Sequence, residues 1–95
     1  MIVQRLTVNV KKGCMDDVLA LLKADRKRTG IDYRIYAINI GTYDQISLEI
    51  ESENLADYEK GWAEWGSTPE AAAFMEKWLE LTKTGGTNEI WTLVE

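Results

Sequence analysis

The fold follows largely from residues 55–81, which read LADYEKGWAEWGSTPEAAAFMEKWLEL. This stretch holds three of the four tryptophans of the chain, its one proline and its one phenylalanine. The apolar residues recur at intervals of three and four, the spacing that places side chains on one face of a helix. One stripe comprises Leu55, Tyr58, Trp62 and Trp65, and the next comprises Ala71, Phe74, Met75, Trp78 and Leu81. We therefore predict two consecutive amphipathic helices.

A break separates these two helices at Gly66, where glycine tolerates a turn. Ser67 followed by Glu70 fits a capping box for the second helix. Thr68 followed by Pro69 fits equally well, because proline is favoured at the first helical position. Helices this aromatic need a sheet or a ligand to cover them.

Alternation of apolar and polar residues predicts strands on both sides of the helical pair. We expect strands at Ile2–Val10, Ile31–Ile40, Gln45–Glu51 and Asn88–Val94, and a first helix at Cys14–Arg28 that Gly30 ends. A turn at Gly41–Asp44 makes the second and third strands a hairpin, and Thr84-Gly85-Gly86 closes the helical pair. Ser52 or Asn54 caps that pair at its start.

The resulting order is β-α-β-β-α-β, with the second helical element split in two. This is the ferredoxin-like arrangement, an α+β fold with one four-stranded antiparallel sheet. Residues 1–95 are too few for a second core, so we expect one domain. Right-handed crossovers would place all helices on one face of the sheet.

The other face of the sheet is apolar in part. Val3 lies on the side opposite Leu6, and Trp91 lies on the side opposite Ile90. An antiparallel sheet with a solvated face should be polar there. We therefore expect a homodimer in which two sheets pack face to face, with Trp91 and Ile35 on the shared face.

The composition excludes several classes of function. A net charge of −5 argues against nucleic acid as a partner. No apolar run approaches the roughly 18 residues of a membrane span, and a single cysteine fits a cytoplasmic setting. Histidine is absent, no CxxC or glycine-rich phosphate loop occurs, and the carboxylates are spaced like solvated surface, so we expect neither a metal site nor a cofactor.

The candidate site is an apolar pocket between helices and sheet. Its walls would be Tyr58, Trp62, Trp65, Phe74 and Trp78, with Asn9 as the polar group and weak catalytic candidate. The alternative is a non-catalytic structural or protein-interaction module in which these aromatics simply fill the core. A cavity of roughly 300 Å³ or more would favour the ligand-binding interpretation.

Two further groups of residues have alternative interpretations. Cys14, beside Lys11 and Lys12 at a helix start, is either an activated thiol or a small buried hydrophobe. A second group could form a polar cluster on the outer face of the sheet, and we expect a network at the subunit interface in preference to the alternative, an acid–base site. That group comprises Arg5, Arg34, Tyr36 and Glu49.

The element order, with the tryptophan-bearing helix and the Ser-x-Pro-Glu-Ala restart within Ser52–Leu81, resembles the dimeric α+β-barrel superfamily. Its members include antibiotic-biosynthesis-monooxygenase-like, NIPSNAP-like and stress-responsive barrel families. In monooxygenase-like and haem-degrading members, an Asn, a Trp and a His serve the pocket. Asn9 and either Trp62 or Trp65 match the first two, and the missing histidine removes the usual haem ligand. The resemblance implies a homodimer with a small-molecule ligand and, as one activity, cofactor-free oxygenation of a phenol or quinol; whether any reaction is catalysed stays open.

Overall fold

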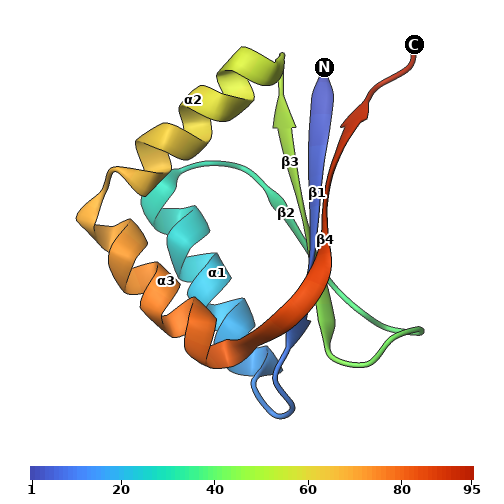
Figure 1. The fold of residues 1–95 in the computed structure, drawn as a ribbon, viewed down its shortest axis with the longest axis vertical. Coiled ribbons are helices and arrows are strands. Elements are labelled where there is room, and N and C mark those ends of the chain that lie inside the picture. The colour runs from blue at the N-terminus through green and yellow to red at the C-terminus, as the bar shows by residue number, and fades with distance from the viewer.

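The computed structural model describes residues 1–95, with three helices on one face of a four-stranded sheet (Figure 1). The elements are β1 (Ile2–Val10), α1 (Met15–Thr29), β2 (Arg34–Ala37), β3 (Gln45–Ser52), α2 (Leu55–Gly66), α3 (Pro69–Leu81) and β4 (Thr82–Thr92). The strand order is β2-β3-β1-β4, and every pairing is antiparallel. The α+β ferredoxin-like prediction is confirmed, including the split second helical element.

Local capping explains where the helices begin and end. α1 ends at Gly30, which adopts a left-handed backbone with φ of 70°. α2 begins after Asn54, whose side-chain oxygen accepts a hydrogen bond from the Asp57 backbone N–H at 2.9 Å. For α3 the structure selects Thr68 as the cap, with Pro69 as the first helical residue. The two alternatives left open by the sequence are thus resolved.

Strand β2 is shorter than the predicted Ile31–Ile40. Its partner β3 begins at Gln45, and the backbone N–H of Ile38 already bonds to the Gln45 carbonyl. Beyond that point the chain has no strand to pair with, so it leaves the sheet as a protruding connection. Ile40 and Tyr43 on this connection are 92% and 91% exposed.

Strand β4 starts earlier than the predicted Asn88. The expected turn at Thr84-Gly85-Gly86 lies inside the strand, where its pairing with β1 shifts register between Thr7 and Asn9. Gly85 and Gly86 have φ of 103° and 90°, and a Cβ on Gly86 would collide with the Thr7 carbonyl. The glycines therefore bend the strand through a bulge instead of ending it.

The fully buried core lies beneath α1. Val10, Val18, Leu22 and Ile46 are at most 1% exposed, whereas α2 contributes no buried residue. Ile35 also packs against this core. The expectation that it lies on the face shared with a second subunit is therefore wrong, because its pairing with Leu48 in β3 directs its side chain towards the helices.

None of the three helices combines the length and apolarity needed to cross a membrane.

Candidate functional site

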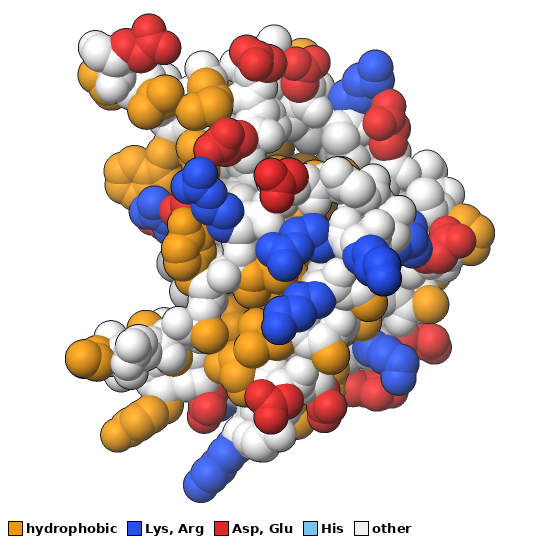
Figure 2. Space-filling model, turned by 180° about the vertical axis from the view of Figure 1, so that it is seen from behind, with side chains coloured by type: hydrophobic (Ala, Val, Ile, Leu, Met, Phe, Trp, Pro, Cys, Tyr) orange, Lys and Arg blue, Asp and Glu red, His pale blue; other side chains and the backbone are white.

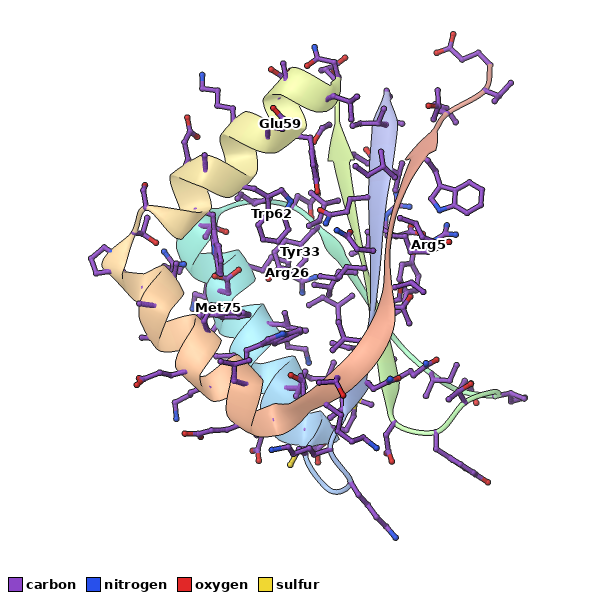
Figure 3. The ribbon with its side chains drawn as sticks, viewed as in Figure 1. Arg5, Arg26, Tyr33, Glu59, Trp62 and Met75 are labelled. Carbon is purple, nitrogen blue, oxygen red and sulfur yellow. The ribbon has the colours of Figure 1, made fainter.

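A cavity of about 530 Å³ lies between the helices and the sheet. All five aromatic residues predicted as pocket walls line it: Tyr58, Trp62, Trp65, Phe74 and Trp78. Tyr33 and Met75 also line it, and Figure 3 shows Trp62 and Tyr33 in the space between the helices and the sheet. The sheet contributes Leu6, Leu48 and Ile50. The volume falls within the range of about 300–1,000 Å³ that is typical of small-molecule sites.

Four aromatic rings form one continuous wall across the break between α2 and α3. Trp62 meets Trp65 edge to face at 5.7 Å and 79°, and Trp65 meets Phe74 in the same way at 5.4 Å and 86°. Phe74 then stacks on Trp78 at 5.5 Å. The turn at Gly66–Thr68 thus brings the two apolar stripes together, and their rings brace one another.

A buried amide fixes the orientation of Trp62. Its indole N–H donates to the Gln4 side-chain oxygen at 2.8 Å, and the Gln4 amide nitrogen donates to the Asn88 side-chain oxygen at 2.8 Å. Gln4 is only 3% exposed. The sequence did carry a signal for it, because Gln4 interrupts the apolar face of β1 between Ile2 and Leu6.

Asp25 on α1 plays the corresponding role for Trp65. Its carboxylate accepts the Trp65 indole N–H at 3.0 Å and the Arg28 guanidinium at 2.9 Å. The Tyr33 hydroxyl lies 3.0 Å from the other carboxylate oxygen and 2.9 Å from the Leu22 carbonyl. Burial, then the Asp25 charge and hydrogen bond, raise the pKa of Tyr33 well above its usual value. Tyr33 therefore remains a neutral donor.

Asn9 is not part of this cavity. Val8 and Val10 point towards the helices, so Asn9 between them points to the opposite face of the sheet. There its side-chain oxygen accepts a hydrogen bond from Gln45 at 3.0 Å. The polar atoms next to the aromatic wall belong instead to Gln4 and Asp25. Cys14 packs, partly buried, against the core, as expected for a small hydrophobe.

The outer face of the sheet carries the predicted polar cluster. Arg5 donates to the Glu49 carboxylate at 3.0 and 2.8 Å, and the Tyr36 hydroxyl lies 3.3 Å from the other Glu49 oxygen. The hydrogen bond from Arg5 lowers the pKa of the Glu49 carboxyl. The Arg5 guanidinium also lies 5.7 Å from the centre of the Trp91 ring. Figure 3 shows Arg5 on the side of the sheet away from the helices.

Hydrophobic side chains accompany this cluster. Tyr36, Trp91 and Leu93 are 46%, 52% and 49% exposed. In Figure 2, hydrophobic and basic side chains project together along the edge of the molecule where this face lies. The open face is thus neither fully polar nor covered by the chain itself.

No model of a known protein family matches the chain, and no curated protein matches it. Solved structures do match. A NIPSNAP domain protein from Burkholderia xenovorans superposes with a TM-score of 0.87, covering 99% of this chain and 95% of its own at 12% identity. A NIPSNAP family protein from Agrobacterium tumefaciens gives 0.86 at 17% identity, covering 99% and 93%. The fold is that of NIPSNAP domain proteins.

An antibiotic biosynthesis monooxygenase superposes less closely, with a TM-score of 0.74 at 14% identity over all of both chains. The superfamily resemblance inferred from the order of elements is therefore confirmed at the level of the fold. Identities this low concern the fold alone, since one fold hosts many functions. The function has to be argued from the site.

Proposed function

We propose that the protein binds a small apolar or aromatic molecule in the cavity between the helices and the sheet. The observation that carries this proposal is the cavity itself, at about 530 Å³. A structural module would have filled this space with Trp62 and Trp78. Instead both residues line it and leave the space open.

The proposal is limited to binding. Cofactor-free oxygenation was an implication of the resemblance, and it assigned the polar role to Asn9. Because Asn9 faces away from the cavity, that activity has no support in the site. The carboxylate nearest the aromatic wall, Asp25, is held by three donors and is already engaged.

Tryptophan fluorescence tests the binding proposal directly. In a Trp91→Phe background the three remaining tryptophans all line the cavity, so emission reports on that space alone. We expect a panel of aromatic polyols, quinones and apolar amines to include a probe that gives a saturable change at micromolar concentration.

A matched pair of variants locates the response. Gly61 lines the cavity, and nothing lies within 4 Å of a Cβ added there, so Gly61→Leu should fill the space and abolish binding. Ala63→Leu, an exposed position on the same helix, should leave binding intact. No saturable response to any probe, or equal binding by both variants, would contradict the proposal.

We also propose that two copies pack sheet against sheet in a homodimer. The exposed Trp91 and Leu93, beside the already paired Arg5 and Glu49, support a face that is covered in the assembly. Trp91→Glu should yield a monomer in sedimentation velocity. Leu79→Glu on α3 adds the same charge at a 68% exposed position and should remain dimeric. A wild-type monomer at micromolar concentration would contradict the dimer.

A cytoplasmic setting also stays a prediction.

A further inference from the structure

The charged residues that line the cavity are all of one sign. Asp25, Glu51, Asp57 and Glu64 are acidic, and neither lysine nor arginine lines the cavity. The chain has 11 basic residues against 16 acidic ones, so this one-sided lining is not explained by a shortage of cations. The sign of these charges indicates which charge a ligand of the proposed cavity should carry.

Only part of this negative charge is neutralised within the protein. Arg28 pairs with Asp25 at 2.9 Å. Glu51 and Asp57 have no ion-pair partner, and Glu64 has only a 4.0 Å contact with Lys60 between two largely exposed side chains, which is a weak interaction in water. Asp57 and Glu64 are exposed residues of α2, so their carboxylates lie where the cavity meets solvent. The Glu51 side chain points to the opposite face of the sheet, because its neighbour Ile50 faces the helices.

Three of the hydrogen-bond donors that line the cavity are used within the protein, whereas the Trp78 indole N–H makes no hydrogen bond. The indole N–H of Trp62 is used by Gln4, and that of Trp65 by Asp25. The Tyr33 hydroxyl is held between Asp25 and the Leu22 carbonyl. An anionic or carbonyl-bearing ligand would find these donors occupied. The rings also line the cavity, and the electron density on a ring face is negative.

The ring geometry is suited to a positive charge. Trp65 stands at 79° to Trp62 and at 86° to Phe74, so neighbouring walls of the cavity are nearly perpendicular. Perpendicular aromatic faces surround an alkylated ammonium group on several sides, and each face attracts it electrostatically. Tryptophan gives the strongest such attraction among the aromatic residues.

We propose that the ligand is an organic cation, an amine or quaternary ammonium that carries an aromatic or aliphatic group. Its apolar part lies among the rings of α2 and α3, and its charge is balanced by the rim carboxylates of Asp57 and Glu64. This inference rests on the proposed binding function and specifies its substrate class.

A pair of isosteric probes separates charge from shape. Phenyltrimethylammonium and tert-butylbenzene have the same shape and differ in the charge of one central atom. Titrated into the Trp91→Phe protein, the cation should bind about tenfold more tightly than the neutral isostere. Benzoate, an anion, should bind more weakly than both. Added NaCl should weaken binding of the cation and leave that of the isostere unchanged.

Charge-removing variants test the rim carboxylates. Asp57→Asn combined with Glu64→Gln should lower the affinity for phenyltrimethylammonium and leave that for tert-butylbenzene unchanged. The affinity for the isostere shows that the cavity is intact in the variant. Glu80→Gln removes one charge from α3 at an exposed position that does not line the cavity, and it should change neither affinity.

The outcomes distinguish this inference from the function on which it rests. If tert-butylbenzene or benzoate binds as tightly as the cation, the charge preference is wrong while the binding function stands. If the double variant keeps the full preference, the assignment of the rim carboxylates is wrong. If no probe gives a saturable response, both proposals fail.

Discussion

The interfaces that α1 and α2 form with the same sheet differ in how completely they close. Beneath α1, aliphatic side chains such as Val18 and Leu22 interdigitate with Val10 and Ile46 and exclude solvent. α2 itself contributes no buried residue, and a cavity remains beneath it. The α2 rings are large and rigid, and they are held at their edges by hydrogen bonds to buried polar side chains. Aliphatic chains adapt their shape and close an interface, whereas tethered rings hold it open.

The largest expected effect is the difference in stability loss between a substitution in the closed core and one in the cavity lining. Ile46→Ala should lower the free energy of unfolding by about 2–5 kcal/mol, because it leaves a hole in the closed core away from the cavity. Met75→Ala removes a side chain that lines the cavity and is 39% exposed, so it should cost less than about 1 kcal/mol. Urea denaturation measures both. Equal losses would mean that the two regions do not differ in packing.

Tyr33 lies between the two regions, since it belongs to the core and also lines the cavity. Tyr33→Phe should cost about 1–3 kcal/mol, because it removes the hydroxyl that lies between the Asp25 carboxylate and the Leu22 carbonyl and hydrogen-bonds there. Because the pKa of Tyr33 is raised, the stability that its hydroxyl contributes depends on pH. The wild-type contribution is complete below the usual tyrosine pKa of about 10 and is lost as pH rises above it, because the unfolded chain releases that proton first.

Comparing denaturation of wild type and Tyr33→Phe at pH 8 and at pH 11 measures this pH dependence. The wild type should lose more stability than the variant over this interval. Parallel losses would show that the Tyr33 hydroxyl has the same affinity for its proton in both states.

Trp62→Phe tests the tether that holds the α2 wall. The Gln4 oxygen, on a residue only 3% exposed, would lose its donor, at a cost of about 1–2 kcal/mol beyond the loss of ring area. Trp78→Phe makes the same change in ring size at an indole whose N–H has no hydrogen bond in the structure. Thermal denaturation should therefore show the larger loss for Trp62→Phe, and the reverse order would be evidence against the tether.

The smallest effect is expected on the outer face, away from both regions. The lowered pKa of Glu49 means that its contribution to stability is present above the usual carboxyl range and is lost as pH falls through the folded-state value. Since the ion pair with Arg5 is partly exposed, the effect should be below about 1 kcal/mol. Glu49→Gln should therefore lose slightly less stability than wild type between pH 7 and pH 3. An identical acid loss would contradict this.

The parts of the structure that sequence predicted correctly depend on local spacing. The stripe from Tyr58 to Trp65 and its continuation in Phe74 and Trp78 follow from helical periodicity, which requires no knowledge of distant residues. The caps at Gly30 and Asn54 are local for the same reason. The length of β2 and the path of β4 depend on the strand with which each one pairs. The residue pattern within each segment therefore predicted the wrong bounds for both strands.

The polar atoms of the site were missed because their partners are distant in the chain. Trp62 and Gln4 are separated by 58 positions, and Trp65 and Asp25 by 40. No spacing rule relates such pairs. Asn9 was misassigned for a related reason. The alternation in β1 shows which residues share a face of the sheet, but the face that borders the pocket depends on where the helices pack.

The absence of a buried side chain in α2 has a dynamic consequence. Since none of its side chains is fully buried, α2 should cost less to detach from the sheet than α1, which buries Val18 and Leu22. Its backbone amides should exchange hydrogen with solvent before those of α1. Brief lifting of α2, with release of its two indole tethers, would give a molecule from solution a way in that leaves the rest of the protein undisturbed.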